Sequence, residues 1–327
     1  ADTEGNGFQI VPEVFLTVVQ LDSVDVSSGT NNQTVVGQEK FYTFGGVGVA
    51  AGDSAKWVPG GGHPTDACDI QTATTVNGNT ASDNVVTVTS PGDSYVKGIS
   101  DGNFLSFGEY SPTNGLPYVL CYAFTSRNLP NALPEPYKMH PEFTLTVSEL
   151  LGVGATAGDN FSTVVHQSKN FAFVGAGVGD GDKVRFISGS NHSAIDLNCL
   201  TDPRAGGMVG ASVTENELTV TGPSGNFANE VTFMLRSNPT EPFRLCYKFG
   251  DEPYRLYPIF TIESRHVLRV QTIVGAPNVA VVNAPKTYYF VGTGQQNAVD
   301  VVKIVGATVT DDAGCATYNI PVTTDGG

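Results

Sequence analysis

Hydrophobic and polar residues alternate in many short runs along this chain, and a period of two is typical of β-strands. Residues 41–44, 85–89, 119–124 and 143–147 are examples, in which aromatic or β-branched side chains alternate with others. Gly, Pro, Asn and Asp separate the runs, as in the turn sequence at residues 90–93. No segment keeps amphipathic helical spacing over three turns, so the pattern predicts an all-β protein.

The strand pattern is part of an internal repeat. Tyr42–Val49 matches Phe171–Val178 without a gap, and a third copy begins at Tyr288. In every copy an aromatic strand leads into a Gly-x-Gly sequence and then into a second strand that carries a Lys or Arg. A cysteine follows in each copy: Cys68, Cys199 and Cys315. These matches predict tandem homologous modules of about 117–129 residues.

The later part of the module repeats as well. Pro117–Phe124 matches Pro242–Phe249, and both contain a Leu-Cys-Tyr strand. The hairpin sequence Glu135-Pro136-Tyr137 then matches Glu252-Pro253-Tyr254. The third copy reaches Gly327 without a counterpart of either feature. We therefore expect two complete modules and a third that lacks its last strands, which would leave an unpaired sheet edge.

Short strands at intervals near ten residues, in modules of about 120 residues, predict antiparallel β-sandwiches. A jelly roll is the alternative, although tandem jelly rolls usually have longer modules. We expect an N-terminal strand segment at 1–18, β-sandwich modules at 19–141 and 142–258, and an incomplete β-sandwich module at 259–327.

Four of the five cysteines form two pairs at matched positions, Cys68 with Cys121 and Cys199 with Cys246. Their separations of 53 and 47 residues are similar to that of the cysteine pair of an immunoglobulin domain, and this resemblance implies two disulfides. Buried free thiols in a reducing compartment are the alternative, but the repetition of the pair favours bridges. Bridges indicate an extracellular or luminal setting. Cys315 lacks a matched partner, which predicts a truncated module or an intermolecular bond.

Composition and charge exclude several function classes. The 327 residues carry a formal net charge of −15, and only 15% of them are charged. Such a chain is unsuited to nucleic acid, because contacts to phosphates require clustered Lys and Arg. No apolar run approaches the roughly 20 residues of a membrane-spanning helix. The first residues lack the basic and apolar regions of a signal peptide, as expected of a mature secreted chain.

Three N-x-S/T sequons occur, at Asn32, Asn160 and Asn191. A chain this rich in Thr, Ser and Asn contains about that many by chance. Asn32 and Asn160, however, lie at similar places upstream of their Gly-x-Gly sequences. In a eukaryotic source we expect N-linked glycans on at least one of the three.

The sequence offers little for catalysis. Gly46-Val47-Gly48 superficially resembles a dinucleotide-binding loop, but a strand-like run follows it where that loop requires a helix. The densest cluster of potential metal ligands has no counterpart in the second module: His63, Asp66, Cys68 and Asp69. Acidic spots such as residues 180–182 are more typical of solvated turns than of calcium sites. No Gly-x-Ser-x-Gly or His-Glu-x-x-His motif occurs, so we expect no enzyme, cofactor or metal.

The cysteine spacing, Trp57 and the Leu-Cys-Tyr strand together resemble tandem immunoglobulin-like β-sandwich repeats. Such repeats occur in secreted filaments, mastigoneme-type flagellar-hair proteins and cell-surface adhesins. One departure is that Trp57 precedes Cys68, whereas the immunoglobulin pattern places a Trp between its two cysteines. The resemblance implies an extracellular protein of structural or adhesive function.

The two ends of the chain do not make up a whole number of modules. This favours a structural subunit of an extracellular filament or surface appendage, which would be a homopolymer assembled head to tail. Residues 11–18 are similar to the strand that closes one module and opens the next, so they could complete the last module of a neighbouring subunit. The residues expected to insert are Pro12, Val14, Phe15, Leu16 and Val18. This segment supplies one strand, whereas about two are missing. The alternative is a cell-surface adhesin or a carbohydrate-binding stalk fragment, in which loop tyrosines stack on sugars.

Overall fold

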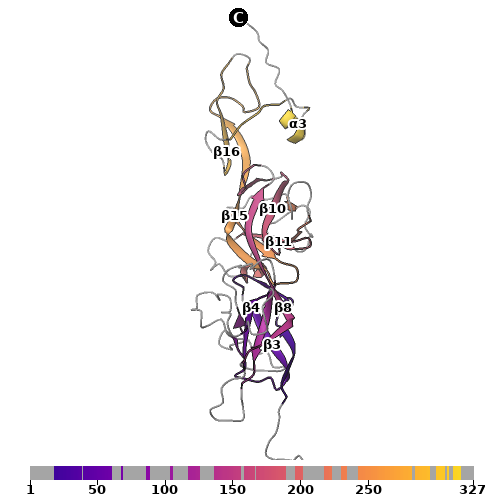
Figure 1. The fold of residues 1–327 in the computed structure, drawn as a ribbon. Coiled ribbons are helices and arrows are strands. Elements are labelled where there is room, and N and C mark those ends of the chain that lie inside the picture. Colours follow the sequence, from indigo (N-terminus) through magenta and orange to yellow (C-terminus); the bar gives the residue numbers. More distant parts are fainter. Residues whose placement is uncertain are drawn as a thin grey trace, which may run out of the picture.

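The computed structural model describes residues 18–38, 40–60, 68, 86–88, 104–105, 117–125, 136–155, 158–165, 167–188, 196–201, 217–222, 230–233, 242–281, 284–294, 300–305, 308 and 312–317. These residues form an elongated column, with β3 (Lys40–Val47) near one end and β16 (Tyr288–Thr293) near the other (Figure 1). Their regular structure is mostly β, which confirms the all-β prediction. The helices α2 (Asn198–Thr201) and α3 (Asp312–Thr317) are short.

The strands of the first module form two sheets. One sheet has the order β1-β3-β6, with β1 at Gln20–Val26 and β6 at Phe104–Leu105. The other has the order β5-β4-β7-β8 and comprises β5 (Val86–Thr87), β4 (Ser54–Pro59), β7 (Tyr118–Ala123) and the first part of β8 (Lys138–Ala155). These pairings are antiparallel, and the short strand β2 (Gln33–Val35) adds a parallel pairing with the middle of β8.

The second module repeats this plan strand for strand. Its first sheet contains the last part of β8, β10 (Lys169–Ala176) and β13 (Glu230–Phe233). Its second sheet contains β12 (Leu218–Thr219), β11 (Lys183–Ser188), β14 (Phe243–Lys248) and the first part of β15 (Arg255–Thr272). The short strand β9 (Ser162–Val164) pairs in parallel with β15, as β2 does with β8.

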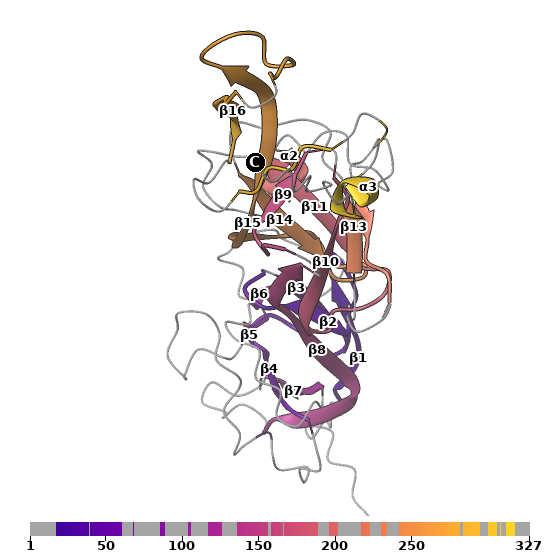
Figure 2. The same ribbon diagram turned by 90° about the horizontal axis from the view of Figure 1, so that it is seen from above.

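Two strands of 18 residues, β8 and β15, each belong to two modules. β8 pairs with β7 through Lys138–Leu145 and then with β10 through Glu149–Ala155, and Figure 2 shows it running from one to the other. β15 pairs in the same way with β14 and then with β16. The module limits expected at residues 141 and 258 fall inside these strands, so a continuous strand joins neighbouring modules.

The repeated Gly-x-Gly sequence has a steric cause. Its first glycine lies where two strands approach closely, and an added Cβ on Gly175 would be 2.0 Å from the carbonyl oxygen of Glu149. The equivalent distances are 2.1 Å at Gly46 and 1.8 Å at Gly292, so each copy excludes a side chain there. Strand pairing therefore explains the motif that superficially resembles a dinucleotide-binding loop.

Each complete module has one apolar core, to which both of its sheets contribute. In the first module, Tyr42 of β3 packs on Trp57 of β4, with ring centroids 5.8 Å apart. In the second, Phe173 of β10 packs on Tyr247 of β14 at 5.2 Å. Because alternate residues of a strand point to opposite faces, these aromatic positions fill the space between the sheets.

A buried aspartate closes the turn between the second and third long strands of each complete module. Asp53 accepts hydrogen bonds from the Ala50 amide, the Thr125 amide and the Tyr122 hydroxyl, each at 2.8 Å. Asp182 makes the equivalent bond to the Tyr247 hydroxyl at 2.6 Å. Burial and this hydrogen bond raise the pKa of Tyr247. In each module the aspartate thus links this turn to a neighbouring strand, β7 in the first module and β14 in the second.

Replacing Tyr122 with Phe removes one hydrogen-bond donor from a fully buried carboxylate. We expect Tyr122→Phe to lower the free energy of unfolding of the first module by about 1.5–3 kcal/mol, the usual worth of a hydrogen bond to a charged group. Denaturant unfolding followed by the fluorescence of Trp57, the single tryptophan, measures this loss. Tyr289→Phe is the control, because Tyr289 is exposed on β16. Equal stability of the two variants would contradict the assignment.

Candidate assembly interface

The third copy of the repeat exposes the apolar positions that the complete modules bury. Phe186 on β11 is 1% exposed, whereas Ile304, at the matching position, is 69% exposed. Leu150 on β8 is 4% exposed, and its match Val267 on β15 is 52% exposed. Among the described strands β16 pairs with β15 alone. Within the part of the chain that the structure describes, the third copy therefore presents an apolar face that no second sheet covers.

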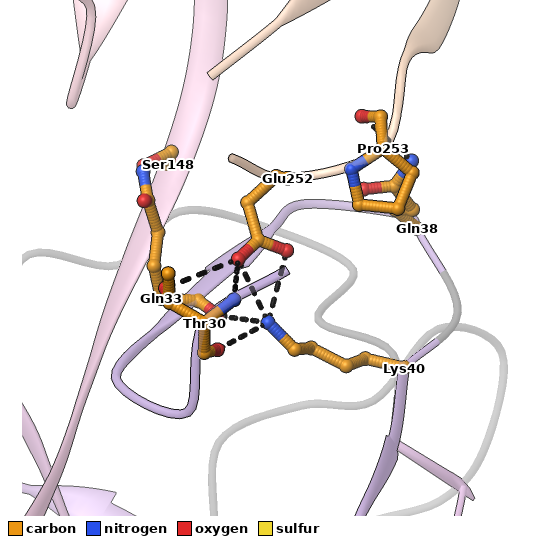
Figure 3. A network of polar contacts seen from close by, with 7 residues as sticks. All are labelled: Thr30, Gln33, Gln38, Lys40, Ser148, Glu252 and Pro253. Carbon is orange, nitrogen blue, oxygen red and sulfur yellow. Dashed lines mark hydrogen bonds and ion pairs between the residues drawn. The ribbon is translucent and has the colours of Figure 1, made fainter. Parts of the chain in front are cut away.

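A buried ion pair joins the first module to the second (Figure 3). Lys40 Nζ, at the start of β3, lies 2.8 Å from Glu252 Oε1, in the turn between β14 and β15, and both side chains are almost fully buried. The glutamate also accepts a hydrogen bond of 2.9 Å from the Thr30 amide. The lysine donates to the carbonyl oxygens of Thr30 and Gln33 at 2.6 and 2.5 Å. Burial lowers the pKa of Lys40, and the hydrogen bond to Glu252 opposes that shift.

The turn that carries Glu252 is fixed from both modules. Gln38 Nε2, in the first module, donates to the carbonyl oxygens of Pro253 and Tyr254 at 3.2 Å. Within the second module, the guanidinium of Arg185 lies 4.2 Å from the centre of the Tyr254 ring. The junction therefore holds the sequence Glu252-Pro253-Tyr254 in a single position against Lys40.

The lysine of this junction belongs to a loop that recurs in all three copies. Each lysine Nζ donates to carbonyl oxygens ten and seven residues before it in the sequence. Each loop also begins with a glycine whose φ is 72° or 73°, a conformation that disfavours other residues. We name these loops the lysine cradles, at residues 29–40, 158–169 and 275–286. Sequence reasoning missed them, because a lysine in each copy looks like an ordinary surface residue.

Both expected disulfides are present, between Cys68 and Cys121 and between Cys199 and Cys246. An immunoglobulin bridge joins the two facing sheets. Here each bridge instead lies on the outer face of one sheet, since Cys246 packs with Cys199 in a small cluster apart from the main core. Strand alternation is the cause, because the neighbours of each strand cysteine point inward. Cys315, in α3, is a free thiol.

The structure describes only some of the remaining predicted residues. Asn32 and Asn160 are exposed, which is compatible with glycosylation, and Asn191 lies outside the described residues. Val18 is 70% exposed beside β1. The remaining predicted insertion residues and most of the candidate ligand cluster also lie outside the described part of the chain: Pro12, Val14, Phe15, Leu16, His63, Asp66 and Asp69.

The described residues contain no group of three or more His, Cys, Asp or Glu side chains that could hold a metal ion. None of the helices found among them has the length and apolar character needed to span a membrane.

No protein-family model matches the sequence, and no curated protein matches it significantly. The geometry of the module junction and of the exposed face therefore carries the functional interpretation.

Removing one partner of the buried ion pair leaves the other charge without compensation. We expect Lys40→Met to lower the free energy of unfolding by about 3–5 kcal/mol, and the double variant Lys40→Met, Glu252→Met to recover most of that loss. Denaturant unfolding followed by Trp57 fluorescence measures both. Lys248→Met is the matched control, since Lys248 is only partly buried and lies outside the junction. A single variant as stable as this control would show that the pair does not hold the modules together.

Proposed function

We propose that this chain is a structural subunit of an extracellular filament or surface appendage that assembles head to tail, without catalytic activity. The exposed apolar face of the third copy is the observation that carries the proposal. Large apolar patches on soluble proteins mark interaction surfaces, and an unpaired sheet edge invites another strand. The exposed face repeats the core positions of the two preceding modules. It therefore fits a partner that supplies the second sheet which covers those positions in the complete modules.

The module plan supports a stack of immunoglobulin-like sandwiches. A sheet of three strands faces a sheet built around β4, β7 and β8, and a short early strand, β2, crosses to run parallel to the last one. This arrangement is close to that of an immunoglobulin sandwich, although the disulfides are placed differently. Shared strands at every junction make such a stack a column, which suits a filament.

The N-terminal segment is the proposed source of the completing strand. In the first module, Leu145 and Val147 of β8 are buried between the sheets. Leu16 and Val18 match these two residues in the sequence. Val18 leads directly into β1 as Val147 leads into the second part of β8. A subunit inserted through residues 12–18 would therefore continue the column with the geometry that β8 already has.

An extracellular location is supported by the two disulfides, which persist in oxidising compartments. The net charge of −15 would limit unspecific association of a concentrated surface protein. The adhesin alternative has four candidate tyrosines, of which Tyr95 and Tyr110 lie outside the described residues. It gains less support from the other two, Tyr137 and Tyr254, since both are engaged within their own modules. Lys56 Nζ lies 4.4 Å from the centre of the Tyr137 ring, and Tyr254 is buried beside Arg185.

Deleting residues 1–18 should abolish assembly, because the completing strand is lost. We expect the full chain to form regular filaments in negative-stain electron microscopy and the deletion variant to stay monomeric. Deletion of residues 1–9 is the matched control and should leave the filaments intact, because the insertion residues begin at Pro12. Leu16→Asp should act like the long deletion, since it places a charge in the completed core.

A full chain that stays monodisperse at all concentrations would contradict the proposal. So would filaments that persist after the longer deletion, because another surface would then hold them together.

A further inference from the structure

One of the three lysine cradles is filled, and the other two are open. An added Cβ on Gly29 would lie 2.4 Å from Glu252 Oε1, so the carboxylate occupies the space above that glycine. At Gly158 and Gly275 the nearest atom is the Nζ of the cradle's own lysine, at 3.8 and 3.9 Å. Among the described residues, the second and third cradles thus keep the shape of the first without its occupant.

Both open cradles form pockets. Residues 273–276, 279, 281 and 284–287 line a pocket of about 440 Å³ around Lys286. A pocket of about 490 Å³ surrounds Lys169 in the second module. The matching place in the first module is where Thr30, Gln38 and Lys40 contact the Glu252-Pro253-Tyr254 turn.

The two open cradles differ in charge. The second contains its own carboxylate, Asp159, whose Oδ2 lies 3.1 Å from Arg265 Nη2. The third has Ala276 at that sequence position. Within the described residues, Lys286 has no carboxylate within ion-pair distance. The third cradle therefore presents a lysine for which the first cradle shows the fitting partner, a glutamate on a Glu-Pro-Tyr turn.

Resting on the head-to-tail assembly proposed above, we propose that the cradle at Lys286 binds the turn Glu135-Pro136-Tyr137 of the next copy of this chain. The carboxylate of Glu135 then takes the position at Lys286 that Glu252 takes at Lys40. The choice of this occupant follows from the order of the modules along the assembly. If residues 12–18 complete the third module, the first module of the next copy follows it as the second module follows the first.

The proposed occupant matches the turn that fills the first cradle in sequence and in the setting of its tyrosine, while Glu135 itself lies outside the described residues. Tyr137 lies beneath Lys56, as Tyr254 lies beneath Arg185, and the two basic residues match in the repeat. The cation-to-ring distances are 4.4 and 4.2 Å. Tyr137 and Tyr254 are thus each held by a basic residue on the third long strand of their own module, β4 or β11.

Charge reversal tests this pairing. Lys286→Glu alone places two glutamates together at each contact between subunits, and Glu135→Lys alone places two lysines together. We expect each variant to assemble at least about tenfold more weakly than the wild type, measured as the critical concentration in light scattering. A one-to-one mixture restores assembly, because every contact then joins Lys to Glu. Lys248→Glu is the control for a changed net charge, and far-ultraviolet circular dichroism confirms that each variant keeps its β structure, since Trp57 reports on the first module alone.

The outcomes separate this inference from the proposed function. Single variants that assemble like the wild type, or a mixture that fails to recover, would overturn the pairing while leaving head-to-tail assembly in place. A wild-type chain that does not assemble would overturn both. Recovery in the mixture alone supports the pairing, because no surface outside the contact gains complementary charges.

Discussion

Two strands that each serve two modules govern this structure. In a sheet the register of pairing fixes which side chains face the core, and a shift of one residue turns all of them to the other face. β8 pairs first with β7 and then with β10, with one register shift in each pairing, so a single continuous strand sets core residues of both modules. The orientation of neighbouring modules is therefore specified by strand pairing, with no linker to bend.

The ion pair between Lys40 and Glu252 depends on that shared strand. The two residues are 212 positions apart in the sequence, and the continuous strand brings their loops together. Burying both charges costs free energy, which is offset only where hydrogen bonds surround them, as the Thr30 amide and two carbonyl oxygens do here. Removal of either partner leaves the other charge buried and uncompensated, so the lysine favours a partner turn that carries a matching glutamate.

Much of the fold follows from local pattern and repetition. Alternation identifies the strands around Tyr42 and Trp57, and the matched copies identify the cysteine pairs. The lysine cradles could not be read in the same way, because their function depends on a contact between distant loops. The signal was nevertheless present, as a glycine eleven residues before a lysine in each copy, at Gly29 and Lys40 for example. The outer position of the bridges could also have been inferred from the sequence. Cys121 lies between two core residues of its strand, so it must point to the opposite face.

The central claim is that the exposed face of the third copy is covered by another copy of the chain. Hydrogen–deuterium exchange of residues 288–305, measured by mass spectrometry from dilute to concentrated solution, tests it directly. The account predicts that exchange in β16 slows several-fold as subunits associate, while β14, already paired on both sides, stays protected throughout. Exchange in β16 that remains fast at every concentration would contradict the account, because no second sheet would then cover the apolar face of the third copy.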